Sequence, residues 1–245
     1  MTASNPLGVQ AGPVTVLTID RPERRNAVDL ATVEALGDAL EAAVDARARV
    51  AVLTGAGGHF CAGADLGGVD DEVFVAALNR TLGLLRHPAL VTLAAIDGVA
   101  LGAGTQFAVS CDLRVATPGA RFGVPAAKLG LAVDHETVRR LAAFAGEGTA
   151  RAMLLATEEL DGAAAHRIGL VQRLGDLAEA TDWAATIADL APLTIAAHKL
   201  GLERLADRAD DPDYAEARKQ AWASQDLQKG LEAFKARRKP EFRGE

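Results

Sequence analysis

The stretch "GVALGAGTQFAVSCDLRV", residues 98–115, decides how this chain folds and what its site can do. Glycines interrupt its apolar first part, and the spacing of the residues that follow predicts a short helix at 103–110. Buried strands are predicted before and after this helix, at 91–98 and 112–116. Gln106 lies inside the helix as an amide, at a place where a catalytic stretch of this kind would carry a carboxylate. What chemistry this glutamine leaves is therefore the main functional question.

Composition limits the classes of function. The 245 residues are 49% hydrophobic, enough to bury the core of one domain or of one domain with an appendage. A formal net charge of −7 gives no general attraction to nucleic acid or anionic lipid, so an anionic ligand needs local basic groups. Cys61 and Cys111 lack metal-binding spacing and are predicted to be buried thiols in a reducing cytosol. With no signal peptide pattern and no apolar run of about 18 residues, we expect a soluble cytoplasmic protein.

The order of elements divides the chain. Strands are predicted at 14–20 and 50–55, Asp29 is predicted to cap the helix that follows it, and another helix is expected near 70–86. Strands and helices alternate to about residue 125, and helices dominate from 134 to the end. This pattern predicts a mixed α/β core carrying a helical C-terminal part.

Six motifs follow one another along the chain: RPERRNA (21–27), HFCAGADL (59–66), GVALGAG (98–104), CDLR (111–114), FGVP (122–125) and KLGL (128–131). In this order and spacing they resemble the enoyl-CoA hydratase/isomerase (crotonase) family, over essentially the whole chain. The resemblance implies a crotonase-like spiral of ββα units as core (1–190) and a helical part for oligomerisation (191–245). It also implies homotrimers or hexamers, an acyl thioester of coenzyme A as ligand, and no other cofactor.

The resemblance further implies that two backbone N–H groups stabilise a thioester enolate, as an oxyanion hole. Motif position assigns these donors to Ala64 and Ala103. The neighbouring Gly63, Gly102 and Gly104 would let the backbone approach a ligand closely. A helix that begins near Ala103 would add the positive end of its dipole.

Hydratases of this family add two glutamates, which would fall at Gln106 and Ala126. Neither an amide nor a methyl group exchanges a proton near neutral pH, so water addition is expected to be weak or absent. Gln106 can still donate and accept hydrogen bonds and so orient the acyl group or a water. Alternatively, nearby backbone simply satisfies its polar atoms.

A second carboxylate could replace the missing ones. Asp134 stands where the dienoyl-CoA isomerases and aryl-CoA dehalogenases of the family place a catalytic aspartate, but it also precedes a helical pattern that it could merely cap. His135 and Glu136 follow on the first turn and could reach the acyl pocket. The sequence "HETVR" lacks the second histidine of a zinc motif, and no metal site is expected.

Coenzyme A brings phosphates that basic groups must meet. The resemblance implies nucleotide contacts from the RPERRNA segment, adenine contacts from the backbone of the CAGADL loop, and contacts from the basic C-terminal segment across a subunit boundary. The residues concerned are Arg24, Arg25, Ala27, Ala62, Ala64, Phe234 and Arg237.

Three functional hypotheses follow. The first is an acyl-CoA-binding protein of fatty-acid metabolism that keeps the thioester site without water chemistry, as in a similar actinobacterial subgroup that lacks both glutamates. The second is an active hydratase or isomerase that uses Asp134 as acid or base, with help from His135. The third is a vestigial pocket on a protein whose surface binds partners.

Overall fold

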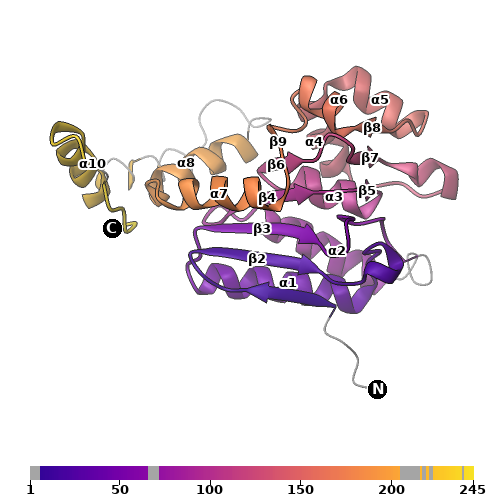
Figure 1. Cartoon of the computed structure of the whole chain (residues 1–245), viewed down its shortest axis with the longest axis horizontal. Helices are drawn as coiled ribbons and strands as arrows, with labels where there is room; N and C mark the ends of the chain where they lie inside the picture. Colours follow the sequence, from indigo (N-terminus) through magenta and orange to yellow (C-terminus); the bar gives the residue numbers. More distant parts are fainter. Residues whose placement is uncertain (1–5, 66–71, 205–215, 217–218, 221–222, 239) are drawn as a thin grey trace.

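A computed structural model describes residues 6–65, 72–204, 216, 219–220, 223–238 and 240–245. Its larger sheet has six strands in the order β1-β2-β3-β4-β6-β9, of which β1 alone is antiparallel to its neighbour (Figure 1). These strands are β1 (Leu7–Gln10), β2 (Val14–Ile19), β3 (Val50–Gly55), β4 (Val91–Ile96), β6 (Leu113–Ala116) and β9 (Arg173–Leu174). The strands predicted at 14–20, 50–55, 91–98 and 112–116 are confirmed to within two residues at each end.

Helices cover both faces of this sheet. In β3, Val50 and Val52 pack toward α7 (Leu177–Ala188), while Leu53 packs toward α1 (Leu30–Asp45) and α2 (Glu72–Leu85). Side chains of a strand alternate between the faces of its sheet, so a strand buried on both faces is apolar at every position. This is why "VAVLTG" lacks the polar alternation of a half-exposed strand.

A second, smaller sheet gives the fold its repeat. It contains β5 (Val99–Leu101), β7 (Arg121–Gly123) and β8 (Leu160–Asp161), and β4 and β6 lead directly into β5 and β7. Isolated bridges from Val28 to Ala64 and from Cys61 to Ala100 extend the pattern to the segments after β2 and β3. Each long strand is thus followed by a short pairing segment and then a helix, which is the ββα spiral that the resemblance implied.

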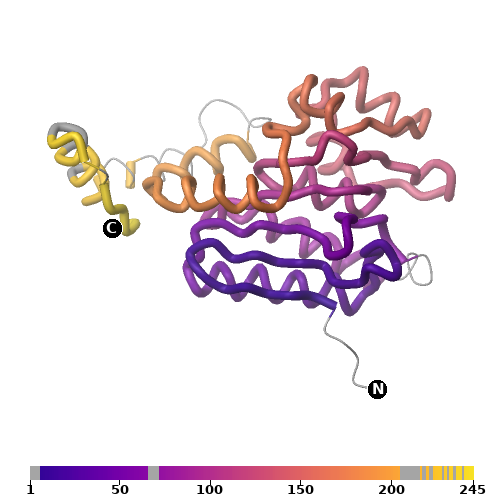
Figure 2. Tube along the Cα trace, viewed as in Figure 1, coloured from indigo at the N-terminus to yellow at the C-terminus, as the bar shows by residue number. Residues whose placement is uncertain are grey.

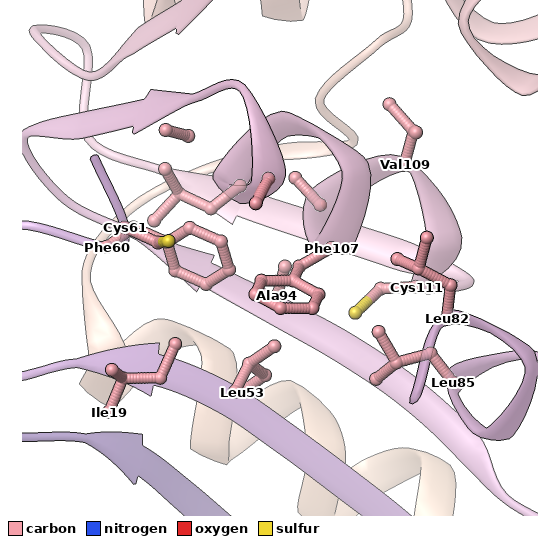
Figure 3. Close-up of a cluster of buried hydrophobic side chains, with 14 of the residues drawn as sticks. Ile19, Leu53, Phe60, Cys61, Leu82, Leu85, Ala94, Phe107, Val109 and Cys111 are labelled. Atoms are coloured by element: carbon pink, nitrogen blue, oxygen red, sulfur yellow. The ribbon is translucent and has the colours of Figure 1, made fainter. Parts of the chain in front are cut away.

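Helix α3 (Ala103–Ser110) begins and ends where the sequence predicted, and all eight of its residues are buried. Phe107 of α3 and Cys111, its C-cap, point into the core toward Leu53 and Leu85 (Figure 3). Both cysteines are free and buried, and burial raises the pKa of each thiol to about 12. The prediction that both thiols are buried is confirmed.

Two buried arginines bind the carboxyl end of α3. Arg114 donates to the carbonyl oxygens of Ala108 and Cys111 at 3.0 and 2.9 Å, and Arg140 donates to that of Val109 at 2.6 Å. Both guanidinium groups lie against the ring of Phe144, 4.3 and 5.2 Å from its centroid. The last carbonyls of a helix have no partner within it, so the two cations supply both hydrogen bonds and favourable charge.

The C-terminal third is mainly helical, as predicted. Its helices are α4 (His135–Ala145), α5 (Glu147–Leu155), α6 (Gly162–Arg167), α7, α8 (Pro192–Glu203) and α10 (Gln225–Lys235), and 3-10 turns occur earlier at Pro22–Arg24 and Pro125–Leu129. The boundary predicted at residue 190 falls in the turn between α7 and α8. None of the described helices is long and apolar enough to cross a membrane.

Buried ion pairs attach α8 to the core. Lys199 donates to the carboxylate of Asp112 at 2.8 Å and to the carbonyl oxygen of Leu90 at 2.6 Å, and Glu203 pairs with Arg140 at 2.6 Å. Farther along the chain, α10 lies beyond α8 (Figure 2). The carboxylate of Asp226 in α10 accepts hydrogen bonds from two backbone N–H groups of the C-terminal tail.

Replacing Lys199 with methionine should lower the free energy of unfolding by about 3 kcal/mol, because the Asp112 carboxylate would lose its buried cation. Urea denaturation measures this loss. The matched control is Arg80→Met, which removes a cation paired at the exposed surface with Asp38 and Glu41 and should change stability little. Equal effects of the two substitutions would contradict the assignment of Lys199 as a buried structural cation.

Candidate functional site

Two glycine-containing loops pack backbone against backbone at the amino end of α3. Leu101 N–H donates to the carbonyl of Cys61 at 3.0 Å, and a side chain on Gly104 would overlap that carbonyl. A Cβ on Gly63 would lie 3.2 Å from the Leu101 carbonyl oxygen, in a backbone with φ of +119°. Glycine is therefore required by close approach at both positions.

Ala64 and Ala103 lie on these two loops, directly after Gly63 and Gly102. Ala103 is the first residue of α3, after the N-cap Gly102, and the first N–H groups of a helix have no partner within it. Within the described part of the chain, neither N–H donates a hydrogen bond. Unpaired backbone N–H groups are the kind of donor that an oxyanion hole requires. The assignment of these two donors remains a prediction.

Asn26 holds the neighbouring loop in place, and sequence analysis gave it no role. Its buried amide donates to the carbonyls of Ala56 and His59 at 2.8 and 2.6 Å, and its oxygen accepts the N–H of Arg21 at 2.9 Å. The backbone of Asn26 is left-handed, with φ of +58°, a conformation that asparagine tolerates better than most residues. Only an asparagine after a short turn hinted at this role.

The residues predicted to contact coenzyme A fall into two groups. Arg24 and Arg25 are exposed, and the carbonyl of Arg25 accepts the N–H of Ala62 at 3.0 Å, which joins the first and second motif loops. Ala27 belongs to the same group because it follows Arg25 in the first motif loop. Its carbonyl accepts a hydrogen bond from the guanidinium of Arg21. Neither Arg24 nor Arg25 forms an ion pair with any other described residue, so both are available to a phosphate.

The second group lies elsewhere. Arg237 is exposed just after α10, which Figure 1 shows at the opposite end of the molecule from β5 and β7. Phe234 lies in α10, but its side chain is outside the described part of the structure. A single chain therefore does not bring Arg237 to Arg24 and Arg25, and the contact across a subunit boundary stays a prediction.

Gln106 and Asp134 form a hydrogen-bonded pair. Gln106, only 7% exposed, donates its amide Nε2–H to the Oδ2 of Asp134 at 3.0 Å. Asp134 also caps α4, accepting the N–H of Thr137 at 2.9 Å and its hydroxyl at 2.5 Å. Burial alone would raise the pKa of Asp134, but the hydrogen bonds from Thr137 and Gln106 outweigh it and lower the pKa. The interpretation of Asp134 as a helix cap is therefore confirmed, and its catalytic role stays a prediction.

The other candidates differ in position. Ala126 packs against the edge of the core, His135 is exposed, and Glu136 is held by Arg139 at 2.6 Å, which lowers the pKa of Glu136. The Nδ1 atom of His59 is buried without a hydrogen bond to any described group. No group of three or more described His, Cys, Asp or Glu residues could hold a metal ion.

Comparison with known proteins identifies the family. The model of the family described as enoyl-CoA hydratase/isomerase matches residues 10–245. The chain belongs to the enoyl-CoA hydratase/isomerase family. Members of this family bind acyl-CoA substrates, so the predicted ligand class is supported at that level. Family membership alone does not specify which reaction this chain catalyses.

Relatives of this family member include the protein named probable enoyl-CoA hydratase echA6 of Mycobacterium tuberculosis (strain CDC 1551 / Oshkosh), 43% identical over 96% of this chain and 98% of the relative. The 2,3-dehydroadipyl-CoA hydratase of Escherichia coli (strain K12) is 34% identical over 94% and 95%. Among solved structures, an enoyl-CoA hydratase/carnithine racemase from Magnetospirillum magneticum superimposes with a TM-score of 0.90 and 28% identity over 99% and 97% of the two chains. The predicted crotonase fold is confirmed.

Asp134→Asn should make stability less dependent on acid pH. A carboxylate whose folded pKa is lowered stabilises the fold above its ordinary value of 3.8 and loses this contribution as the pH falls through the folded value. Asparagine caps helices about as well as aspartate, so the variant keeps the cap. We expect lower stability than wild type at neutral pH and a difference that closes below pH 3.8. Urea unfolding at several pH values measures it, and a pH-independent difference would contradict the assignment.

Proposed function

We propose that this protein binds an acyl-CoA thioester of fatty-acid metabolism between the N–H groups of Ala64 and Ala103 and adds water to it poorly or not at all. One observation carries the proposal: the N–H groups of Ala64 and Ala103 have no hydrogen-bond partner among the described residues, while the side chain one turn farther along α3 is Gln106, bound to Asp134. The pocket can thus hold and polarise a thioester without a group that delivers a proton. We expect the protein to act in the cytoplasm as a homotrimer or hexamer.

The missing acid and base groups account for weak hydration. A positioned acid or base contributes roughly 10² to 10⁴ to a rate, and neither Gln106 nor Ala126 can exchange a proton near neutral pH. The amide of Gln106 is further engaged by the Asp134 carboxylate, so it cannot activate water as a glutamate would. Polarisation of the thioester by the backbone donors is then the chemistry that remains.

A second candidate is a hydratase or isomerase that uses Asp134 as acid or base. In its favour, Asp134 contacts Gln106, a residue of the same helix as the proposed donor Ala103. Against it, the carboxylate accepts three hydrogen bonds and its pKa is lowered, which makes it a weak base and deprives it of a proton to donate. We therefore rank this candidate second.

The variant Ala103→Pro tests the proposed thioester site. Proline fits the first position of a helix, where it removes an N–H that has no helical partner. Affinity for butyryl-CoA should fall about tenfold, the value of one hydrogen bond. Calorimetric titration measures it.

The matched control is Glu147→Pro, because Glu147 is also the first residue of a helix that follows a glycine N-cap with positive φ. It should leave butyryl-CoA affinity unchanged. If Ala103→Pro folds like the control and binds as tightly as wild type, the Ala103 N–H is not a thioester donor.

Turnover of crotonyl-CoA, followed by loss of the conjugated thioester absorbance, separates the two candidates. We expect negligible turnover by wild type at high protein concentration and a gain in the double variant Gln106→Glu with Ala126→Glu, which restores both carboxylates. Fast turnover by wild type that Asp134→Asn abolishes would favour the second candidate over the first.

A further inference from the structure

Two backbone hydrogen bonds fasten the loop around Ala64 to Val28. The N–H of Val28 donates to the carbonyl of Gly63 at 2.9 Å, and the carbonyl of Val28 accepts the N–H of Asp65 at 2.8 Å. This is the pattern of a parallel bridge, in which the residue between the two bonded neighbours turns its own N–H to the opposite side. The Ala64 N–H therefore faces away from Val28, and this bridge sets its direction.

The guanidinium of Arg21 contacts both segments that form the bridge. Its Nη1 donates to the carbonyl of Ala27 at 2.5 Å and its Nη2 lies 2.9 Å from the carboxylate of Asp29, so the residues before and after the bridging valine are both held. The same Nη2 lies 3.7 Å from the carboxylate of Asp65 in the other segment. The Arg21 side chain is only 16% exposed, so solvent and salt screen these ion pairs less than they screen pairs at the surface.

We propose that Arg21 is a positioning residue that fixes the direction of the Ala64 N–H by holding Asp65 beside residues 27–29. This inference rests on the proposed thioester site. Among the described residues, no other cation pairs with Asp29 or Asp65. Without Arg21, two carboxylates that now share one nitrogen would repel each other across the bridge. Arg21 thus acts on the ligand through the backbone of Ala64.

The second proposed donor is held by other groups. Ala103 is the first residue of α3, and Arg114 and Arg140 bind the carbonyl end of that helix. Loss of Arg21 should therefore weaken one of the two hydrogen bonds to the thioester oxygen and leave the other in place. The expected defect is partial and is confined to ligands that carry this oxygen.

The experiment compares butyryl-CoA with S-butyl-CoA, a thioether that has a methylene group in place of the carbonyl. The two ligands share the coenzyme and the length of the alkyl chain, so the ratio of their affinities reports the hydrogen bonds to the thioester oxygen. Calorimetric titration at pH 7 measures both. Wild type should prefer butyryl-CoA about a hundredfold, about tenfold for each hydrogen bond. Arg21→Met should lower this preference to about tenfold and leave the affinity for S-butyl-CoA unchanged.

Two conservative substitutions compare the carboxylates that Arg21 binds. Asp65→Asn keeps the size of the side chain and removes the charge that ties Arg21 to the loop, so it should lower the preference about threefold. The matched control is Asp29→Asn, which removes the other charge, keeps the cap of α1 and leaves Arg21 bound to Ala27 and Asp65. This control should retain the wild-type preference. Should Arg21→Met fail to fold, these two variants decide the question.

A second control is Arg173→Met, which removes an arginine that pairs with Glu179 at 2.9 Å in another part of the fold. It should bind both ligands like wild type. If wild type binds butyryl-CoA and S-butyl-CoA equally, the proposed thioester site is wrong.

Other results overturn the role of Arg21 while the thioester site stands. One is a wild type that prefers butyryl-CoA together with an Arg21→Met variant that keeps this preference. Another is an equal loss of affinity for both ligands in Arg21→Met, which would assign Arg21 to the coenzyme or to the fold as a whole. A third is an Asp29→Asn variant that lowers the preference as much as Asp65→Asn.

Discussion

The rest of the site depends on the complete burial of α3. A short helix leaves backbone N–H groups unpaired at one end and carbonyl groups unpaired at the other, and burial removes the water that would otherwise satisfy them. Arg114 and Arg140 satisfy the carbonyl end with hydrogen bonds and positive charge. At the amino end, the Ala103 N–H has no acceptor among the described residues. A ligand oxygen can therefore form a hydrogen bond there without displacing one within the protein.

The two ends are connected through distant parts of the chain. Arg140 comes from α4 and is held by Glu203 of α8, while Lys199 of α8 binds Asp112 just beyond α3. The N-cap of α4 is Asp134, the partner of Gln106. Helices α4 and α8 therefore fix the carbonyl end of α3, and the N-cap of α4 fixes the glutamine in its middle. The position of the amino end of α3 and the orientation of Gln106 thus depend on the same packing.

Local patterns predicted much of this arrangement. The limits of α3, the caps Asp29 and Asp134 and the buried cysteines follow from spacing and from residue type. Pairings between distant segments could not be predicted in this way. Gln106 and Asp134 are separated by 28 positions and Lys199 and Asp112 by 87, and nothing in the sequence near one partner specifies the other. The role of Asn26 was missed for the same reason, since its amide bonds carbonyls 30 and 33 positions away.

We propose that the N–H groups of Ala64 and Ala103 receive a thioester oxygen. The most direct measurement is a crystal structure of the protein with butyryl-CoA, in which the distances from the thioester oxygen to the two backbone nitrogens are read. We expect both distances to be about 2.7 to 3.1 Å, the range of a formed oxyanion hole. A bound thioester whose oxygen faces neither nitrogen would contradict it.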